Sequence, residues 1–187
     1  MSAELRELRL QQKRRLVQEK IREFPDFPVP GVVFRDISPL LKDPAAFGAS
    51  IDLLEAHVKK LPDRVDFIAG LDSRGFLFGP ILAQRLGVGF VLVRKKGKLP
   101  GPTISAAYNL EYGKAEVEVQ GDAVNPGQNV ILIDDLLATG GTMRTACELM
   151  TKLQANILDC LVLIELKSLK GAEALQPFPF HSILQFD

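Results

Sequence analysis

Two adjacent aspartates, Asp134 and Asp135, lie between an apolar run and a turn of small and hydroxyl-bearing residues. The apolar run, residues 130–133, fits a buried strand, and a helical pattern begins at Met143. Glycines let backbone amides turn toward an anion, threonines add hydroxyl donors, and a helix start adds unpaired N–H groups. The turn therefore predicts a phosphate site made of Ala138, Thr139, Gly140, Gly141 and Thr142.

Carboxylates directly beside a phosphate site would repel the anion. A sugar phosphate resolves this conflict, because Asp134 and Asp135 can accept hydrogen bonds from its hydroxyls or steady a magnesium ion. A triphosphate-binding P-loop is excluded, since no lysine stands between Gly141 and Thr142, and the dinucleotide fingerprint is also missing. An ordinary strand-to-helix loop is the plain alternative. The coincidence of all these features at the end of one buried strand argues against it.

A second strand, turn and helix unit carries charged residues in its turn. The pattern predicts a strand over 65–71, a helix over 76–86, and between them Asp72, Ser73, Arg74 and Gly75. Parallel strands bring their carboxyl ends to one edge of a sheet, so this turn should face the same crevice as residues 138–142. A third strand, 89–94, leads into Arg94, Lys95 and Lys98. These cations either serve only to keep the protein soluble or, together with Arg74, surround a diphosphate.

The remaining pattern predicts an α/β fold with a mostly parallel twisted sheet and helices on both faces. Helices are expected from Asp43 onward and over 143–153 and 172–175, and strands over 158–166 and 182–186. Residues 3–23 read as a basic amphipathic helix, and the prolines of 24–39 favour an extended segment. Alternation over 105–120 predicts a hairpin that turns near Gly113 and covers the crevice as a flap, which would exclude water.

Composition suits one globular domain, with 187 residues of which 47% are hydrophobic. Lys plus Arg and Asp plus Glu both number 23, so no general attraction to nucleic acid or membrane is expected. The start of the chain has no apolar centre of a signal peptide, which predicts a cytoplasmic protein. Cys147 and Cys160 are expected to be buried reduced thiols, and His57 and His181 to be structural or surface residues rather than catalysts.

The segment VILIDDLLATGGT resembles the phosphoribosyl pyrophosphate motif of type I phosphoribosyltransferases. The segment FPDFPVPGVVFRDISPLL resembles the adenine-binding hood of the adenine phosphoribosyltransferase family, and the similarity continues from Phe24 to Phe186. The resemblance implies the type I phosphoribosyltransferase fold, with a helical extension over 1–23 and one domain over 24–187. That domain would include a hood at 24–41 and a flap at about 97–120. It also implies a homodimer, and magnesium held mainly by substrate and water.

The resemblance further implies transfer of a 5-phosphoribosyl group from phosphoribosyl pyrophosphate to adenine. Asp134 and Asp135 would hold the ribose, residues 138–142 its phosphate, and residues 72–75 the pyrophosphate, often with a cis peptide between the first two residues of that loop. Charged residues after the third strand would also bind the pyrophosphate. The implied base contacts are Val33, Phe34 and Arg35.

In that family a glutamate and a tyrosine of the flap, here Glu111 and Tyr112, lie near N7 of adenine and over the closed site. The implied catalytic residues are thus Glu111, Asp134, Asp135 and Arg74. Two alternatives remain: a transferase for another nucleobase, and a regulatory protein that binds the sugar pyrophosphate without catalysis. The second would not need the 72–75 turn or the flap.

Overall fold

The computed structural model describes residues 3–109 and 114–187, which form two compact units. The first unit extends to His57 and the second runs from Val58 to Asp187. The elements of the first unit are α1 (Ala3–Gln18), β1 (Arg22–Pro25), β2 (Val33–Asp36), α2 (Ser38–Lys42) and, up to the boundary, α3 (Pro44–Val58). Strands β1 and β2 form a separate two-stranded antiparallel sheet.

Helix α1 ends at Gln18, whereas the sequence pattern predicted a helix through residue 23. The last predicted residues instead belong to β1, where charged side chains pair across the two strands. Arg22 bonds Asp36 at 2.5 Å, and Glu23 bonds Arg35. Opposite charges on facing strands stabilise a hairpin, so tertiary pairing overrides the helical pattern here.

Helix α3 begins where the sequence predicted a helix start. The Asp43 carboxylate accepts hydrogen bonds from the amides of Ala45 at 3.0 Å and Ala46 at 3.1 Å, and Pro44 occupies the first helical position. An ion pair of 2.5 Å between Lys13 of α1 and Asp52 of α3 joins the two helices.

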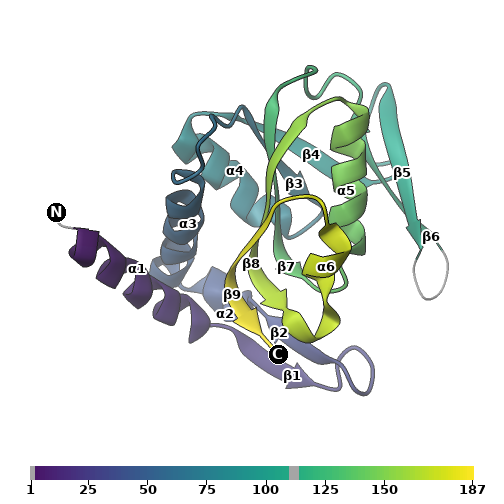
Figure 1. The fold of residues 1–187 in the computed structure, drawn as a ribbon. Coiled ribbons are helices and arrows are strands. Elements are labelled where there is room, and N and C mark those ends of the chain that lie inside the picture. Colours follow the sequence, from purple (N-terminus) through teal and green to yellow (C-terminus); the bar gives the residue numbers. More distant parts are fainter. Residues whose placement is uncertain (1–2, 110–113) are drawn as a thin grey trace. The chain divides into compact units, whose positions relative to one another are not determined.

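The second unit contains one seven-stranded sheet in the order β5-β6-β4-β3-β7-β8-β9 (Figure 1). Strands β4, β3, β7, β8 and β9 run parallel to one another, whereas β6 is antiparallel to both β4 and β5. The predicted mostly parallel α/β sheet is therefore confirmed. Its elements are β3 (Phe67–Leu71), α4 (Gly75–Leu86), β4 (Gly89–Lys95), β5 (Thr103–Asn109), β6 (Lys114–Gln120), β7 (Asn129–Leu137), α5 (Gly141–Lys152), β8 (Asn156–Leu166), η1 (Lys167–Leu169), α6 (Gly171–Leu175) and β9 (Phe180–Phe186).

Helices cover both faces of this sheet. Helix α4 packs so closely on one face that a Cβ at Gly79 would meet the side chains of Phe90 and Ile133. Helix α5 packs on the other face, where Ala146 joins a buried apolar cluster with Ala69 and Leu132. Because side chains of a strand alternate between faces, the apolar runs of β3 and β7 supply both cores.

Strand β7 is longer than the sequence indicated. The prediction that it stops at Asp134 and Asp135 is wrong, since the strand continues to Leu137. Strand β8 runs beside it throughout, with Leu136 opposite Ile164 and Leu137 opposite Glu165. The two acids are therefore held by strand pairing, and the turn begins only after them.

The predicted hairpin is also present, with β5 and β6 antiparallel and paired from Thr103 opposite Gln120 to Asn109 opposite Lys114. Its turn, with the predicted site residues Glu111 and Tyr112, lies outside the described residues.

Cys147 of α5 and Cys160 of β8 are both free and buried, as predicted, and their sulfur atoms lie 3.3 Å apart. The hydrogen bond shared between the two thiols, and secondly burial, raise the pKa of Cys160 above its ordinary value. Cys160 is therefore a neutral thiol, and both buried side chains pack as small apolar groups. Among the described helices, none is long and apolar enough to cross a membrane.

Candidate active site

Two adjoining pockets open at the carboxyl ends of β3 and β7. The first, of about 210 Å³, is lined by Arg74, Asp134, Leu136, Leu137, Met143 and residues 138–142, which we call the phosphate turn. The second, of about 230 Å³, is lined by Asp72, Ser73, Arg74, Asp134 and Asp135. Because Arg74 and Asp134 line both, the two predicted anion sites lie side by side at one edge of the sheet, as the topology requires.

The phosphate turn ends in the first residues of α5. Gly140 precedes the helix with a φ of +85°, a left-handed conformation that favours glycine. The Arg144 amide bonds the Gly140 carbonyl at 2.8 Å, so the amides of residues 141–143 lie at the N-terminus of the helix, ahead of this bond. Such amides, with the positive end of the helix dipole, suit an anion.

The turn packs against the start of α6. The sequence predicted this short helix but not its contact with the turn. A Cβ at Gly140 would lie 2.8 Å from the Gly171 carbonyl, and a Cβ at Gly171 would collide with the Ala138 carbonyl. Arg144 fastens α5 to the same segment by donating to the carbonyls of Ala174 at 3.0 Å and Gln176 at 2.7 Å. A glycine at a helix start gives no sign of such a contact, because the contact is made between distant parts of the chain.

The two acids of β7 have different surroundings. Asp135 is 2% exposed, and its Oδ2 lies 2.7 Å from Nε of Arg74, whose side chain is 45% exposed. Asp134 accepts the Asp135 amide at 2.9 Å. Burial, and secondly the charge of Asp135, raise the pKa of Asp134 well above its ordinary value. One acid is therefore a paired carboxylate, and the other tends to keep its proton.

The turn after β3 lies within reach of β4. The peptide bond between Asp72 and Ser73 is cis, as the resemblance implied. Nε of Arg94 lies 3.1 Å from Oδ2 of Asp72, and its Nη1 donates to the Lys98 carbonyl at 3.2 Å. The structure thus brings Arg94, Asp72 and the Lys98 backbone together, while Lys95 and Lys98 are both exposed.

The predicted base contacts lie on β2 of the first unit. Val33 is exposed, and the half-buried Phe34 ring meets Phe27 edge to face with 5.1 Å between centroids. The Arg35 side chain is buried and paired with Glu23, and burial lowers its pKa. A base contact by Arg35 would therefore come from its backbone.

Carboxylate oxygens are the donors that magnesium prefers, and the second pocket offers them from Asp134 and Asp135. Over residues 3–109 and 114–187, no three His, Cys, Asp or Glu side chains gather as a metal site of their own. These residues fit a magnesium ion that takes one or two carboxylates and completes its coordination with substrate and water.

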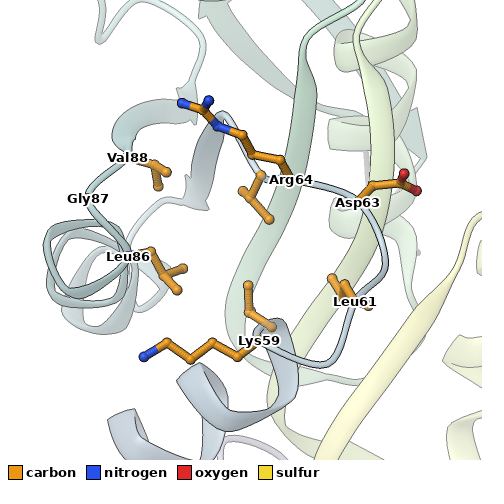
Figure 2. A pocket seen from close by; sticks show the side chains of 9 residues that line it. Lys59, Leu61, Asp63, Arg64, Leu86, Gly87 and Val88 are labelled. Atoms are coloured by element: carbon orange, nitrogen blue, oxygen red, sulfur yellow. The ribbon is translucent and has the colours of Figure 1, made fainter.

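A third hollow, of about 250 Å³, lies at the opposite ends of the strands, where Val65 precedes β3 and Val88 precedes β4. In Figure 2 the side chains of Lys59 and Arg64 extend along its two sides, and that of Asp63 points away. It contains neither the acid pair nor the glycine-rich turn, and none of the predicted site residues line it.

The Phosphoribosyl transferase domain matches this chain over residues 36–177. The adenine phosphoribosyltransferase of Homo sapiens is 66% identical over 173 residues, which cover 92% of this chain and 96% of that protein. The chain belongs to the adenine phosphoribosyltransferase family. It is therefore an enzyme of the pentosyltransferase class, as the sequence predicted.

Solved structures of adenine phosphoribosyltransferases share the fold. The enzyme of Saccharomyces cerevisiae, complexed with an imino-altritol bisphosphate and adenine, has a TM-score of 0.90 at 41% identity and covers 93% of this chain and 99% of its own. The enzyme of Trypanosoma brucei, in complex with AMP, pyrophosphate and ribose-5-phosphate, has a TM-score of 0.84 at 27% identity, covering 92% and 79%. The type I phosphoribosyltransferase fold predicted from the sequence is confirmed.

Proposed function

We propose that this protein transfers the 5-phosphoribosyl group of phosphoribosyl pyrophosphate to adenine, giving AMP and pyrophosphate. The observation that carries the proposal is the pair of adjoining pockets that share Arg74 and Asp134. One has the amide-rich turn that a monophosphate needs, and the other has acids and a guanidinium beside it. A ribose that bridges the two would present its C1 between acids and cations.

Each pocket takes one end of the donor in this proposal. Residues 138–142 bind the 5-phosphate through backbone amides and threonine hydroxyls, and Asp134 and Asp135 accept hydrogen bonds from the ribose hydroxyls. Residues 72–75, with Arg94, Lys95 and Lys98, bind the pyrophosphate and neutralise its growing charge. As the bond from C1 to the pyrophosphate oxygen breaks, the nearby carboxylates stabilise the positive charge on the sugar, and N9 of adenine forms the new bond.

The hood takes the base in the same proposal, with Phe34 against the ring and backbone groups of Val33 and Arg35 on its edge. The Val32 carbonyl accepts from Phe27, which places that backbone group toward β1. In an antiparallel pair successive residues alternate in direction, so the backbone groups of Val33 and Arg35 should point to the open edge of β2. An open edge can hydrogen-bond a flat heterocycle.

Glu111 and Tyr112 complete the proposed site from the flap, with Glu111 managing the proton that adenine exchanges at N7 or N9 and Tyr112 covering the closed site. Replacing Glu111 with Leu should lower kcat far more than it raises the KM values. An unchanged kcat in this variant would show that Glu111 does not have this role.

Magnesium is the proposed cofactor, held mainly by the diphosphate, the ribose hydroxyls and water, with Asp134 or Asp135 as protein ligands. When bound, it would neutralise charge on the departing pyrophosphate.

We further propose a homodimer. The side chains of Leu77 and Ile81, one turn apart on α4, and of Leu92 on β4 are 37–39% exposed. Leu92 shares its face of the sheet with Phe90, whose ring meets Phe76 of α4, so these side chains lie on one side of the sheet. An apolar patch of this kind fits a second copy of the chain. We also propose a cytoplasmic location, because the chain's two cysteines are unbonded thiols, the state that a reducing compartment maintains.

The decisive experiment is incubation of the purified protein with adenine, phosphoribosyl pyrophosphate and magnesium, followed by chromatography for AMP. Competition by guanine, hypoxanthine and uracil measures the base preference. Formation of AMP with adenine preferred is the expected result. Binding of phosphoribosyl pyrophosphate without turnover of any base would contradict the proposal and indicate a regulatory protein.

A further inference from the structure

Glu118 of β6 is a buried acid outside the two pockets. It is 3% exposed, and it stands directly opposite Arg94 in the pairing of β4 with β6. Its Oε1 accepts the backbone amides of Lys98 and Leu99, both at 2.8 Å, and its Oε2 accepts the Thr103 hydroxyl at 3.2 Å. A buried carboxylate requires such partners, and here the partners are the main chain of the loop after β4.

The loop is shaped around this carboxylate. Gly97 has a φ of +80°, and its amide also bonds Glu118, so three successive amides converge on one side chain. Successive amides around a left-handed residue form an anion-binding concavity. Burial acts to raise the pKa of Glu118, but the amides of Leu99, Gly97 and Lys98 and the Thr103 hydroxyl lower it overall. The glutamate is therefore charged and occupies the concavity itself.

The backbone of Lys98 is held from both sides as a result. Glu118 accepts its amide, and Nη1 of Arg94 donates to its carbonyl at 3.2 Å. Arg94 in turn bonds Asp72 of the turn after β3 at 3.1 Å. Lys98 is exposed, and its two bonds given above involve only its backbone. Its ammonium group can therefore bind an anion while the backbone is held in place.

We propose that Glu118 is a positioning residue for pyrophosphate recognition. It fixes the main chain of residues 97–99, so that Lys98 and Arg94 are held for the diphosphate of the donor. The proposal rests on the proposed function, in which these two cations bind pyrophosphate. Glu118 also connects strand β6 of the flap to the pyrophosphate side of the site, because its side chain extends from β6 and bonds the loop after β4.

The test compares Glu118→Met with Glu118→Gln. Methionine has a similar length and volume but no oxygen, so the three amides lose their acceptor. Glutamine keeps one carbonyl oxygen at the position of Oε1, which accepts both amides given above. We expect Glu118→Met to raise the KM for phosphoribosyl pyrophosphate, and for pyrophosphate in the reverse reaction, on the order of tenfold. Glu118→Gln should stay within about threefold, and the KM for adenine should not change in either variant.

Glu116 offers a matched control on the same face of β6. Its carboxylate bonds the side chains of Lys96 at 2.7 Å and Ser105 at 2.6 Å. Glu116→Met should therefore leave the KM for pyrophosphate unchanged. In a Lys98→Ala background, Glu118→Met should add much less than its single effect, because two residues that act through one contact are not additive.

Gly97→Ala reaches the same concavity from the loop, should Glu118→Met fail to fold. No atom lies within 4 Å of a Cβ there, but the positive φ is strained for alanine, so the same selective rise in KM is expected. A Glu118→Met enzyme with wild-type KM for pyrophosphate, or with equal rises in all KM values, would overturn the inference alone. A wild-type protein that forms no AMP would overturn the proposed function and this inference with it.

Discussion

At the residue scale, the site contains cations and acids that satisfy one another in the free protein. Arg74 pairs with Asp135, and Arg94 pairs with Asp72. An acid beside an anion site is costly unless a cation or a hydroxyl donor compensates it. The guanidinium groups of Arg74 and Arg94 compensate the acids here. In the proposed function the ribose hydroxyls would bond the acids instead, and the arginines would then bind the pyrophosphate.

The Asp135→Asn substitution tests the role of this buried carboxylate. The amide keeps the shape of the side chain but loses the charge that would stabilise a cationic sugar. We expect kcat to fall by about 100-fold or more, with an unchanged circular dichroism spectrum. Steady-state kinetics on a folded sample measure the loss, and wild-type turnover would refute the assignment.

The raised pKa of Asp134 predicts a pH-dependent stability. The folded protein holds this proton to a higher pH than the unfolded chain does, so stability is lost as pH rises from the ordinary aspartate range through the raised pKa. An asparagine side chain at this position does not titrate and can still accept the Asp135 amide. The stability of the Asp134→Asn variant relative to the wild type should therefore increase with rising pH. At neutral pH its free energy of unfolding should exceed that of the wild type by on the order of 1 kcal/mol.

Urea unfolding of both proteins at about pH 4 and about pH 8 measures this difference. The gain should be present only at the higher pH. The same difference in the free energy of unfolding at both pH values would show that Asp134 is not the titrating group.

At the element scale, the phosphate turn depends on helix α6, which lies about thirty residues further along the chain. Gly140 combines a positive φ with a backbone contact to Gly171 that leaves no space for a side chain. In the proposed function the turn binds the phosphate through its backbone amides, so its shape would determine the affinity.

Gly140→Ala should therefore raise the KM for phosphoribosyl pyrophosphate at least tenfold and destabilise the protein by about 1–3 kcal/mol. Gly48→Ala is the control, since this helical glycine of α3 has no atom within 4 Å of a Cβ. It should stabilise the protein by about 0.5–1 kcal/mol and leave the KM unchanged. Thermal unfolding and kinetics of both variants provide the measurements, and an unaffected Gly140→Ala enzyme would show that the turn does not grip the phosphate.

The same elements show what the sequence could reveal. Strands β3, β4, β7 and β8 and helices α4 and α5 were predictable, because buried parallel strands are short apolar runs and glycine, proline and acid signals mark their ends. Hairpin β1-β2 and the extension of β7 to Leu137 were not. Both depend on partners distant in sequence, Asp36 and Arg35 for the first and Ile164 and Glu165 for the second. The positions of Gly171 and Glu118 beside the site were hidden for the same reason.

At the scale of the whole molecule, the apolar side chains on α4 and β4 predict self-association. Replacing Ile81 with Asp places a charge in the proposed interface, and light scattering after size exclusion should show a monomer where the wild type is a dimer. Gln84→Asp on the same helix, outside the exposed apolar group, is the control. A wild-type protein that elutes as a monomer at micromolar concentration would contradict the proposed dimer.

The chain has two cysteines, and both are buried beside each other between α5 and β8. A maleimide dye added to the folded protein should therefore find no native point of attachment. A cysteine introduced at the exposed Ala107 of β5 would be the single labelling position. Fluorescence from that dye could then follow the hairpin in real time during turnover, in a protein that keeps both of its own sulfhydryl groups.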